Sequence, residues 1–235
     1  MAMLKVELHT HTSDDPEDYI PHSATELIDH AVSLGYQALA ITLHNRQLKL
    51  PWLEGYARDR GLLLIPGVER TLAGKHILLI NFPEEAAQVR SFEEIAALKG
   101  RCDGLVVAPH PFFPSASCLR ELLDRYRELF DAVEINHFFT RSVDFNRRAW
   151  KWAQENGKGV VGNSDVHHLS QLGRTYSLVD SEPSAGAICD AIRKGRVEIR
   201  STPLTWLQIG RIVGQLAVDR VLHGLQTAKT ATPSD

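Results

Sequence analysis

The sequence predicts an α/β fold built around a largely parallel sheet. Apolar, strand-like runs alternate with helical patterns along almost the whole chain, an order typical of a barrel or a doubly wound sheet. Most of the runs are continuously apolar, as in residues 62–65 and 105–108, which indicates strands that are covered on both faces. At 235 residues the chain is long for one domain but normal for a single α/β barrel.

Nine segments have the composition of strands. In the first of them Val6 and Leu8 alternate with charged residues, which is the period-two pattern of a strand. The predicted strands are 4–9, 38–43, 62–68, 76–80, 104–109, 132–137, 158–162, 175–180 and 197–200.

Seven segments have helical patterns. The first begins at Ser23, which can cap it, and Glu26 three residues later completes the pattern of a capping box. Gly35 stands where helices commonly end on a left-handed residue, and Gly157 and Gly195 end later helices in the same way. The predicted helices are 23–34, 51–60, 91–99, 116–130, 143–156, 184–194 and 204–224.

No linker divides the chain. We expect one barrel domain over 1–203, a C-terminal helix packed on it over 204–226, and a disordered tail over 227–235. The formal net charge of −3 gives no basic field for nucleic acid, and no apolar run reaches the roughly 18 residues that cross a bilayer. No signal peptide is visible, and the three cysteines lack CxxC spacing, so we expect a cytoplasmic protein without a disulfide framework.

Histidines and carboxylates gather at the ends of the predicted strands. His9 and His11 follow the first strand, and residues i and i+2 of a strand point to the same side. Asp165 and His167 repeat that spacing after a later strand. In a barrel the C-terminal strand ends form the active face, so these residues should meet, and imidazoles with carboxylates suit Zn²⁺, Mn²⁺ or Fe²⁺. The other polar residues at strand ends are His44, Glu69, His76, His110, Glu134, Asn136 and His137.

The motifs around these residues resemble those of the PHP family, named for polymerase and histidinol phosphatase. The resemblance spans about residues 4–200 and implies a distorted (β/α)7 TIM-like barrel that holds two or three divalent metal ions (Zn, Mn or Fe) and hydrolyses phosphoesters. The motifs, in family order, are His9-Thr-His11-Thr, Ile41-Thr42-Leu43-His44, Gly67-Val68-Glu69, His76, Ala108-Pro109-His110-Pro111 and Asn163-Ser164-Asp165-Val166-His167.

The resemblance also implies a set of metal ligands and catalytic residues. The first metal site takes His9, His11, Glu69 and Asp165, and Glu69 bridges to a second site with His76 and His110. His44 and His167 form a third site with an acidic residue that follows the His-x-His motif, either Asp14 or Asp15, of which we take Asp15. The implied catalytic residues are Glu69, Asp165 and His167, and Glu134 and Asn136 are expected to hydrogen-bond to the ligands.

One position departs from the family pattern. The family usually has Asp before the histidine of the second motif, where this chain has Leu43, so a carboxylate is lost at the mouth of the barrel and the third site is in question. A phosphate ester also needs a cationic clamp, for which the fork of arginine is suited, and Arg46 and Arg174 are the expected phosphate-binding residues.

The sequence therefore predicts a metal-dependent phosphoesterase that uses a metal-bridging hydroxide on a small phosphomonoester or a nucleotide-type phosphodiester. One alternative is an amidohydrolase-like enzyme acting on C–N or C–O bonds, since such barrels also begin with His-x-His. Another is a metal-binding PHP module of weakened activity, which Leu43 would favour. The expected partner is a small-molecule phosphoester, with no obligatory nucleic acid and no membrane, because no basic groove or appended domain is visible.

Overall fold

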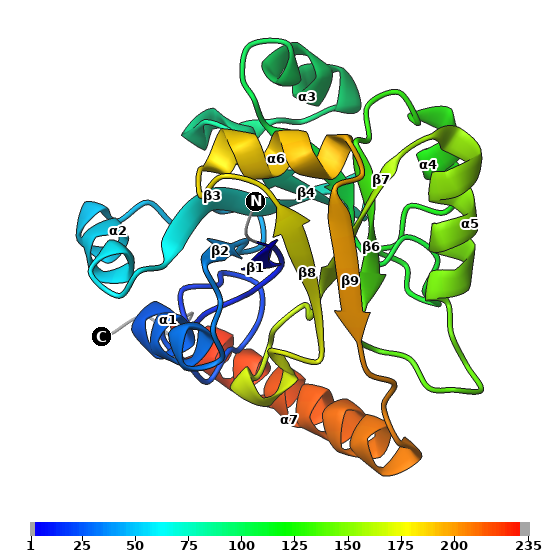
Figure 1. Cartoon of the computed structure of the whole chain (residues 1–235). Helices are drawn as coiled ribbons and strands as arrows, with labels where there is room; N and C mark the ends of the chain where they lie inside the picture. Colours follow the sequence, from blue (N-terminus) through cyan, green and yellow to red (C-terminus); the bar gives the residue numbers. More distant parts are fainter. Residues whose placement is uncertain (1–2, 231–235) are drawn as a thin grey trace.

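The structure is a computed structural model that describes residues 3–230, with side chains to residue 225. Within these residues one sheet carries the fold, with its strands in the order β7-β6-β5-β4-β3-β2-β1-β8-β9 (Figure 1). The strands are β1 (Met3–Glu7), β2 (Ala38–Ile41), β3 (Leu63–Leu72), β4 (Lys75–Ile80), β5 (Leu105–Ala108), β6 (Ala132–Asn136), β7 (Gly159–Asn163), β8 (Thr175–Asp180) and β9 (Val197–Ser201).

Helices connect and flank these strands. They are α1 (Ala24–Ser33), α2 (Pro51–Arg58), α3 (Phe92–Lys99), α4 (Glu121–Arg125), α5 (Asn146–Asn156), α6 (Ala185–Arg193) and α7 (Trp206–Thr230), with short 3-10 turns η1 (Glu84–Gln88) and η2 (Leu169–Gln171). The capping box at the start of α1 is present, because the Ser23 side chain accepts from the amide of Glu26 and the Glu26 carboxylate accepts from the amide of Ser23.

The sheet curls into a nearly closed barrel. β1, β2 and β3 are mutually parallel, as are β5, β6 and β7, and β4 runs antiparallel between the two groups. Beyond the strand ends, the amide of His11 donates to the carbonyl of Val166 at 3.0 Å, and the amide of Val166 donates to the carbonyl of His9 at 3.1 Å. These bonds join the β1 and β7 segments. The predicted α/β barrel in a single domain is confirmed.

The direction of β4 differs from the parallel sheet that the sequence suggests. Only Ala73 and Gly74 separate β3 from β4, and both have positive φ, 49° and 71°. Such a two-residue turn forms an antiparallel hairpin, whereas a parallel partner needs a crossover of a dozen or more residues. β8 and β9 likewise pair antiparallel, with β8 antiparallel to β1. The reversal of β4 brings its first residues to the C-terminal ends of the parallel strands.

The fourth helix is much shorter than predicted. α4 covers five residues, where the apolar pattern suggested a helix over 116–130. The carbonyl of Ser117 accepts a hydrogen bond from the amide of His76 at 2.9 Å, and Arg120 has a φ of 48°. The chain before α4 therefore forms a loop bound to the start of β4, and this loop takes the place of the first helical turn.

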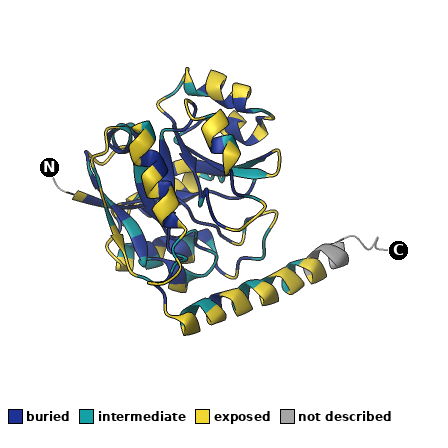
Figure 2. Cartoon of the chain, turned by 90° about the vertical axis from the view of Figure 1, so that its right-hand side faces the viewer, coloured by how far each residue is buried: buried dark blue, intermediate teal, exposed yellow. Residues whose placement is uncertain are grey.

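Helix α6 closes the N-terminal end of the barrel. Its residues Ile188, Cys189, Ala191 and Ile192 are fully buried and belong to the same apolar cluster as side chains of β1, β2, β4 and β5. Figure 1 shows α6 lying across that end, and Figure 2 shows the buried residues concentrated in the strands and on the inward faces of the helices. The opposite end, where the parallel strands finish, is left for a functional site.

Helix α7 runs past this opposite end. It begins after the buried Leu204 and packs through Ile212, while Leu207 is 86% exposed. Figure 2 shows α7 as a mostly exposed rod beside the barrel. It continues to Thr230, into the segment expected to be a tail, and residues 231–235 lie outside the described part of the chain. No helix in the described residues is both long enough and apolar enough to cross a membrane.

Candidate metal centre

The C-terminal end of the barrel gathers the histidines and carboxylates that the sequence singles out. His76 stands at the start of a strand, and it reaches this end because β4 is antiparallel to its neighbours. The residues whose imidazole and carboxylate groups face one another here are His9, His11, His44, Glu69, His76, His110, Asp165 and His167.

Glu69 lies at the middle of this group. Its Oε1 atom is 2.7 Å from Nδ1 of His76 and 3.7 Å from Nε2 of His110. Its Oε2 atom lies 3.2, 3.3 and 3.1 Å from the Nε2 atoms of His9, His11 and His44. Each oxygen therefore faces a different set of imidazoles, which is the arrangement that a bridging carboxylate needs.

Asp165 adds a second carboxylate on the β7 side. Its Oδ1 atom is 3.2 Å from Nε2 of His9 and 3.6 Å from Nε2 of His11. Asp165 has a φ of 48° and His110 a φ of 30°, a backbone region that non-glycine residues seldom adopt. Such strain is typical of functional sites, where the surrounding structure holds a side chain in a required direction.

These donors fit a divalent cation. Three triads have their potential ligand atoms within 4.8 Å of one another: His9, His11 and Asp165; His9, Glu69 and His110; and His11, His44 and Glu69. The atoms Nε2 of His9, Nε2 of His11 and Oε1 of Glu69 are buried and make no hydrogen bond to the described residues. Their neighbours are other imidazole and carboxylate groups of the cluster, and a bound cation could accept all three atoms as ligands.

A second layer of carboxylates orients the imidazoles. Glu134 is 2.7 Å from Nδ1 of His9 and accepts hydrogen bonds from the side-chain amides of Asn136 and Asn163. The contact leaves Nε2 of His9 directed at the centre, and a carboxylate behind a metal-bound imidazole fixes its tautomer and raises its basicity. Glu134 and Asn136 occupy the supporting positions expected for them.

Asp15 also lies in this second layer. Its carboxylate is 2.9 Å from Nδ1 of His11 and 3.1 Å from Nδ1 of His44, the nitrogens that point away from Glu69. This differs from the direct ligand role expected for Asp15, while Asp14 bonds to Thr12 and lies outside the cluster. Asp18 lies closer to His167 than Asp15 does, with its Oδ2 atom 3.3 Å from Nε2 of that histidine. The only signal for Asp18 in the sequence was its place in the acidic run 14–18.

Opposite charges hold the centre together. Burial by itself would raise the pKa of Glu69, but the imidazoles of His76 and His9 outweigh it and hold that pKa well below its usual range. Burial would likewise lower the pKa of His9, yet the carboxylates around it, Asp165 first, raise that pKa well above its usual value. The imidazoles therefore carry positive charge where a divalent cation would otherwise sit.

An open pocket of about 330 Å³ lies over the centre. Its lining includes the metal-facing residues, the aromatic side chains of Tyr19, Phe113 and Phe138, and part of α7. Among the described residues that line the pocket, Arg220 of α7 is the only lysine or arginine. His137 also lines it, is buried with neither ring nitrogen hydrogen-bonded to the described residues, and burial lowers its pKa to about 4.

The two arginines predicted to bind phosphate lie elsewhere. Arg46 donates to the backbone carbonyl of Asp14, and neither Arg46 nor Arg174 is part of the pocket lining in the described structure. Both arginines were expected to bind phosphate because they are close in sequence to the proposed ligands His44 and His167. Sequence reasoning missed Arg220 as a pocket residue because nothing in the sequence indicates where α7 lies.

Known proteins match parts of this sequence, and solved structures match its fold. Residues 144–197, which include Asp165 and His167, match the PHP-associated family. Over 83 residues the chain is 35% identical to the PolC-type DNA polymerase III of Caldanaerobacter subterraneus, an alignment that covers 35% of this chain but only 6% of that polymerase.

Solved structures share the barrel. A two-domain Bacteroides vulgatus protein described as containing a PHP-like metal-dependent phosphoesterase superposes with a TM-score of 0.66 at 19% identity, over 85% of this chain and 65% of the other. The lesion-specific endonuclease Q of Pyrococcus furiosus gives 0.61 at 20% identity, over 84% and 57%. An amidohydrolase of Chromobacterium violaceum gives 0.56 at 15% identity, over 88% and 96%.

These matches correct one expectation and confirm another. The expected small-molecule substrate without nucleic acid is wrong, because the similar proteins include DNA polymerases and an endonuclease Q solved in complex with a 27-mer duplex that carries an abasic lesion. That expectation rested on the net charge and on the lack of a visible basic groove, neither of which identifies a substrate class. The family match, the polymerase relatives and the phosphoesterase barrels together confirm the resemblance to the PHP family that the motifs indicate.

Proposed function

We propose that this chain is a metal-dependent hydrolase of phosphodiester bonds in nucleic acid. The observation that carries the proposal is Glu69, whose two oxygens face two different sets of imidazoles at the open end of the barrel. Divalent ions held there supply Lewis acidity and an acidified water at neutral pH.

We assign the ligands by the atoms that face the centre. His9, His11 and Asp165 form one site, His76 and His110 a second, and Glu69 is shared between them. His44 and His167, with Asp18, form a third. The donor set favours Zn, Mn or Fe in two or three sites.

His167 is suited to move a proton on the pocket side. It lines the pocket, and its Nδ1 atom lies 3.1 Å from the backbone carbonyl of Asp165, which orients the ring. Its Nε2 atom, 3.3 Å from Asp18, would bind a cation when the third site is filled, and when that site is empty it is the nitrogen that can give a proton to a leaving oxygen. Glu69 and Asp165 supply the negative charge that holds the cations in place.

The pocket supports nucleic acid as the substrate class. The aromatic side chains of Tyr19, Phe113 and Phe138 line it together with the metal-facing residues, and bases of a single strand stack on such rings. The net charge of −3 provides no extended basic surface, so a short stretch of strand around the cut bond is the part that is recognised. The cytoplasmic location expected from the sequence belongs to the same proposal.

The test is a cleavage assay with protein whose content of Mn, Zn and Fe has been measured. Single-stranded, duplex and abasic-site oligonucleotides are offered beside p-nitrophenyl phosphate. We expect cleavage of an oligonucleotide, its loss in Asp165→Asn, and its retention in the matched surface variant Asp190→Asn, because Asp190 pairs with Lys194 and Arg196 on the surface and lies outside the pocket lining. A metal-loaded protein that leaves every phosphodiester intact would overturn the proposal.

The amidohydrolase-like alternative is tested in the same series. The Chromobacterium violaceum amidohydrolase shares the barrel and was solved with sulfate bound, which favours keeping C–N and C–O substrates in the assay. Hydrolysis of lactones or amides, with all phosphodiesters untouched, would reverse the order of the two functions.

A further inference from the structure

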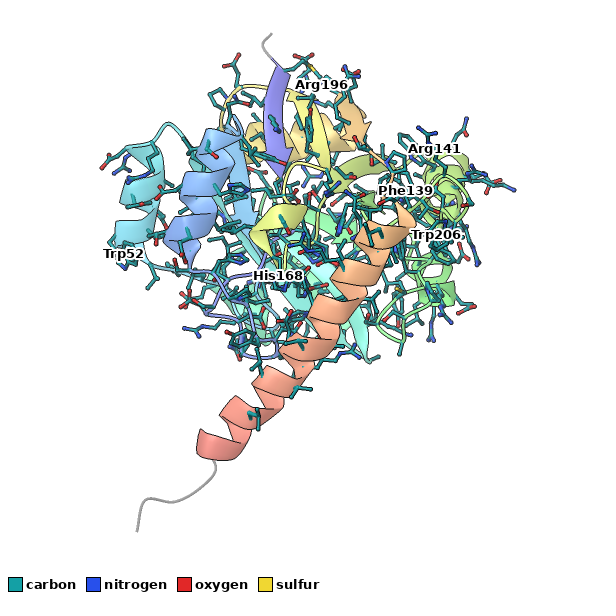
Figure 3. The ribbon with its side chains drawn as sticks, turned by 90° about the horizontal axis from the view of Figure 1, so that it is seen from below. Trp52, Phe139, Arg141, His168, Arg196 and Trp206 are labelled. Atoms are coloured by element: carbon teal, nitrogen blue, oxygen red, sulfur yellow. The ribbon has the colours of Figure 1, made fainter. Side chains whose placement is uncertain are left out.

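Helix α7 forms the outer wall of the pocket above the metal centre. Ile212, Leu216, Asp219 and Arg220 all line the pocket, and their spacing of four, three and one residues places them on one side of the helix. Figure 3 shows α7 crossing the end of the barrel from Trp206 past His168 and then leaving the domain. The helix therefore contributes directly to the space that a substrate would fill.

One ion pair ties this wall to the loop that carries the metal ligands. Oδ2 of Asp219 lies 2.7 Å from Nε2 of His168, and their side chains are only 13% and 18% exposed. His168 directly follows His167, so the contact sets the position of α7 relative to the centre. On the outward side of the helix, Leu207, Val218 and Val221 are 86%, 58% and 62% exposed.

Arg220 is available to bind an anion. Its guanidinium makes no hydrogen bond or ion pair with the side chains that the structure describes, and the adjacent Asp219 is already engaged by His168. The remainder of the pocket lining consists of imidazoles, carboxylates, aromatic and apolar side chains and neutral polar ones. A guanidinium presents a planar fork of N–H donors that matches two oxygens of a phosphate.

We propose that Arg220 binds the phosphate next to the one that is cut, and that the His168–Asp219 pair positions it there. The inference rests on the proposed function and assigns its substrate site. The metal-facing atoms of Glu69 and Asp165 form the floor of the pocket, whereas Arg220 belongs to its outer wall, so the two ends of the pocket receive successive phosphates of one strand.

The test compares Arg220→Gln with Arg211→Gln, a matched substitution at an exposed arginine of α7 outside the pocket lining. Manganese-loaded protein is assayed on a single-stranded oligonucleotide and on bis(p-nitrophenyl) phosphate, which has one phosphate only. For Arg220→Gln we expect KM for the oligonucleotide to rise roughly tenfold, with kcat within about twofold. Rates on bis(p-nitrophenyl) phosphate, and both activities of Arg211→Gln, should match the wild type.

A binding measurement gives a second readout that needs no metal. Fluorescence anisotropy of the labelled oligonucleotide in EDTA, at several salt concentrations, should show a Kd that rises for Arg220→Gln and a log–log salt slope shallower by about 0.7, the value of one single-strand phosphate contact. The inference would be overturned if Arg220→Gln and Arg211→Gln had the same KM, Kd and salt slope. It would also be overturned if Arg220→Gln lost as much activity on bis(p-nitrophenyl) phosphate as on the oligonucleotide. Wild-type protein that cleaves nothing would contradict the proposed function instead, and the anisotropy contrast would still decide for or against Arg220.

Discussion

Glu69 shows how one side chain organises the whole centre. It is 1% exposed and lies within 3.7 Å of imidazole nitrogens from five histidines, with its two oxygens facing different sets of them. Glu69→Gln keeps the size of the side chain but replaces one oxygen with an N–H donor that repels a cation. We expect the variant to lose at least about one equivalent of bound metal in elemental analysis.

Glu54→Gln on the exposed face of α2 is the matched control and should keep the metal content of the wild type. A Glu69→Gln protein with unchanged metal content would mean that the ions, if bound, lie elsewhere in the barrel.

Leu43 has a structural reason for its departure from the family pattern. It is fully buried in the apolar cluster that includes Leu27 and Leu53 of α1 and α2, while the next residue, His44, faces the centre. Leu43→Asp would therefore place an unpaired carboxylate among apolar side chains, and we expect it to lower the free energy of unfolding by roughly 3 kcal/mol or more. Denaturant unfolding, with Leu43→Met as a control expected to cost less than about 1.5 kcal/mol, checks this.

A stable Leu43→Asp variant would contradict this account of Leu43. If Leu43→Asp is as stable as the wild type and binds an additional metal ion, the side chain at position 43 faces the centre and the family pattern applies after all.

Two pairs of residues in the cluster could be predicted from local geometry. His9 and His11 sit two residues apart after a strand, so the pleat directs both to one side, and Asp165 and His167 repeat the pattern. Asp18 and Arg220 could not be found this way. The acidic loop offers several carboxylates with no period to choose among them, and the pocket position of Arg220 depends on where tertiary contacts hold α7.

Among the elements, the strands were predictable and their directions were not. All nine apolar runs became strands, because a continuous apolar run has few other ways to be buried. The direction of a strand depends on the length of the connection before it. The sequence pattern shows the segment before β4 only as a gap between two strands, whereas the structure has a two-residue turn there. Without the direction of β4, the sequence gives no reason why His76, at the start of a strand, lies beside residues at the ends of other strands.

Helix α7 depends on few contacts for its position. Its inward side meets the pocket through Ile212 and Leu216, and its polar tie is the Asp219–His168 pair. Asp219→Asn removes the charge from that pair, so we expect the amides of α7 to exchange hydrogen with solvent several-fold faster while those of the barrel strands do not change. Hydrogen–deuterium exchange followed by mass spectrometry measures both regions in one experiment.

Asp190→Asn, which removes the charge from the surface pairs of Asp190 with Lys194 and Arg196, serves as the control and should leave α7 unaffected. Unchanged exchange in Asp219→Asn would show that apolar packing alone holds the helix over the pocket.

At the scale of the whole molecule, the folded barrel brings together imidazole and carboxylate groups that are far apart in the sequence. The metal-facing groups come from β1, β2, β3, β4, β5 and β7 or the loops after them, while α6 seals the other end. A bound ion therefore crosslinks most of the barrel, and its binding free energy adds to the stability of the fold.

This assembly predicts how metal binding depends on pH. In the metal-free protein the pKa values of His9 and His11 lie well above their usual value, because the surrounding carboxylates outweigh the effect of burial. The pKa of His110 is raised as well, by its contact with Cys118 first and then by Glu69 and Asp165. These imidazoles thus carry protons at neutral pH, and each must lose its proton before it can bind a cation. Lower pH favours the protonated, metal-free form, so metal affinity should fall as the pH is lowered from 8 to 6.

Calorimetric titration of Mn²⁺ in two buffers of different ionisation enthalpy counts the protons released. We expect the observed heat to depend on the buffer, with more than one proton released per protein. Glu134→Gln removes a carboxylate that raises the pKa of His9, so this variant should release fewer protons and bind the metal about 10–100-fold more weakly, as substitutions behind a metal-bound histidine do. The exposed Glu128→Gln is its control. Heats that are the same in both buffers would mean that the histidines are already neutral, and that the carboxylates alone attract the cations.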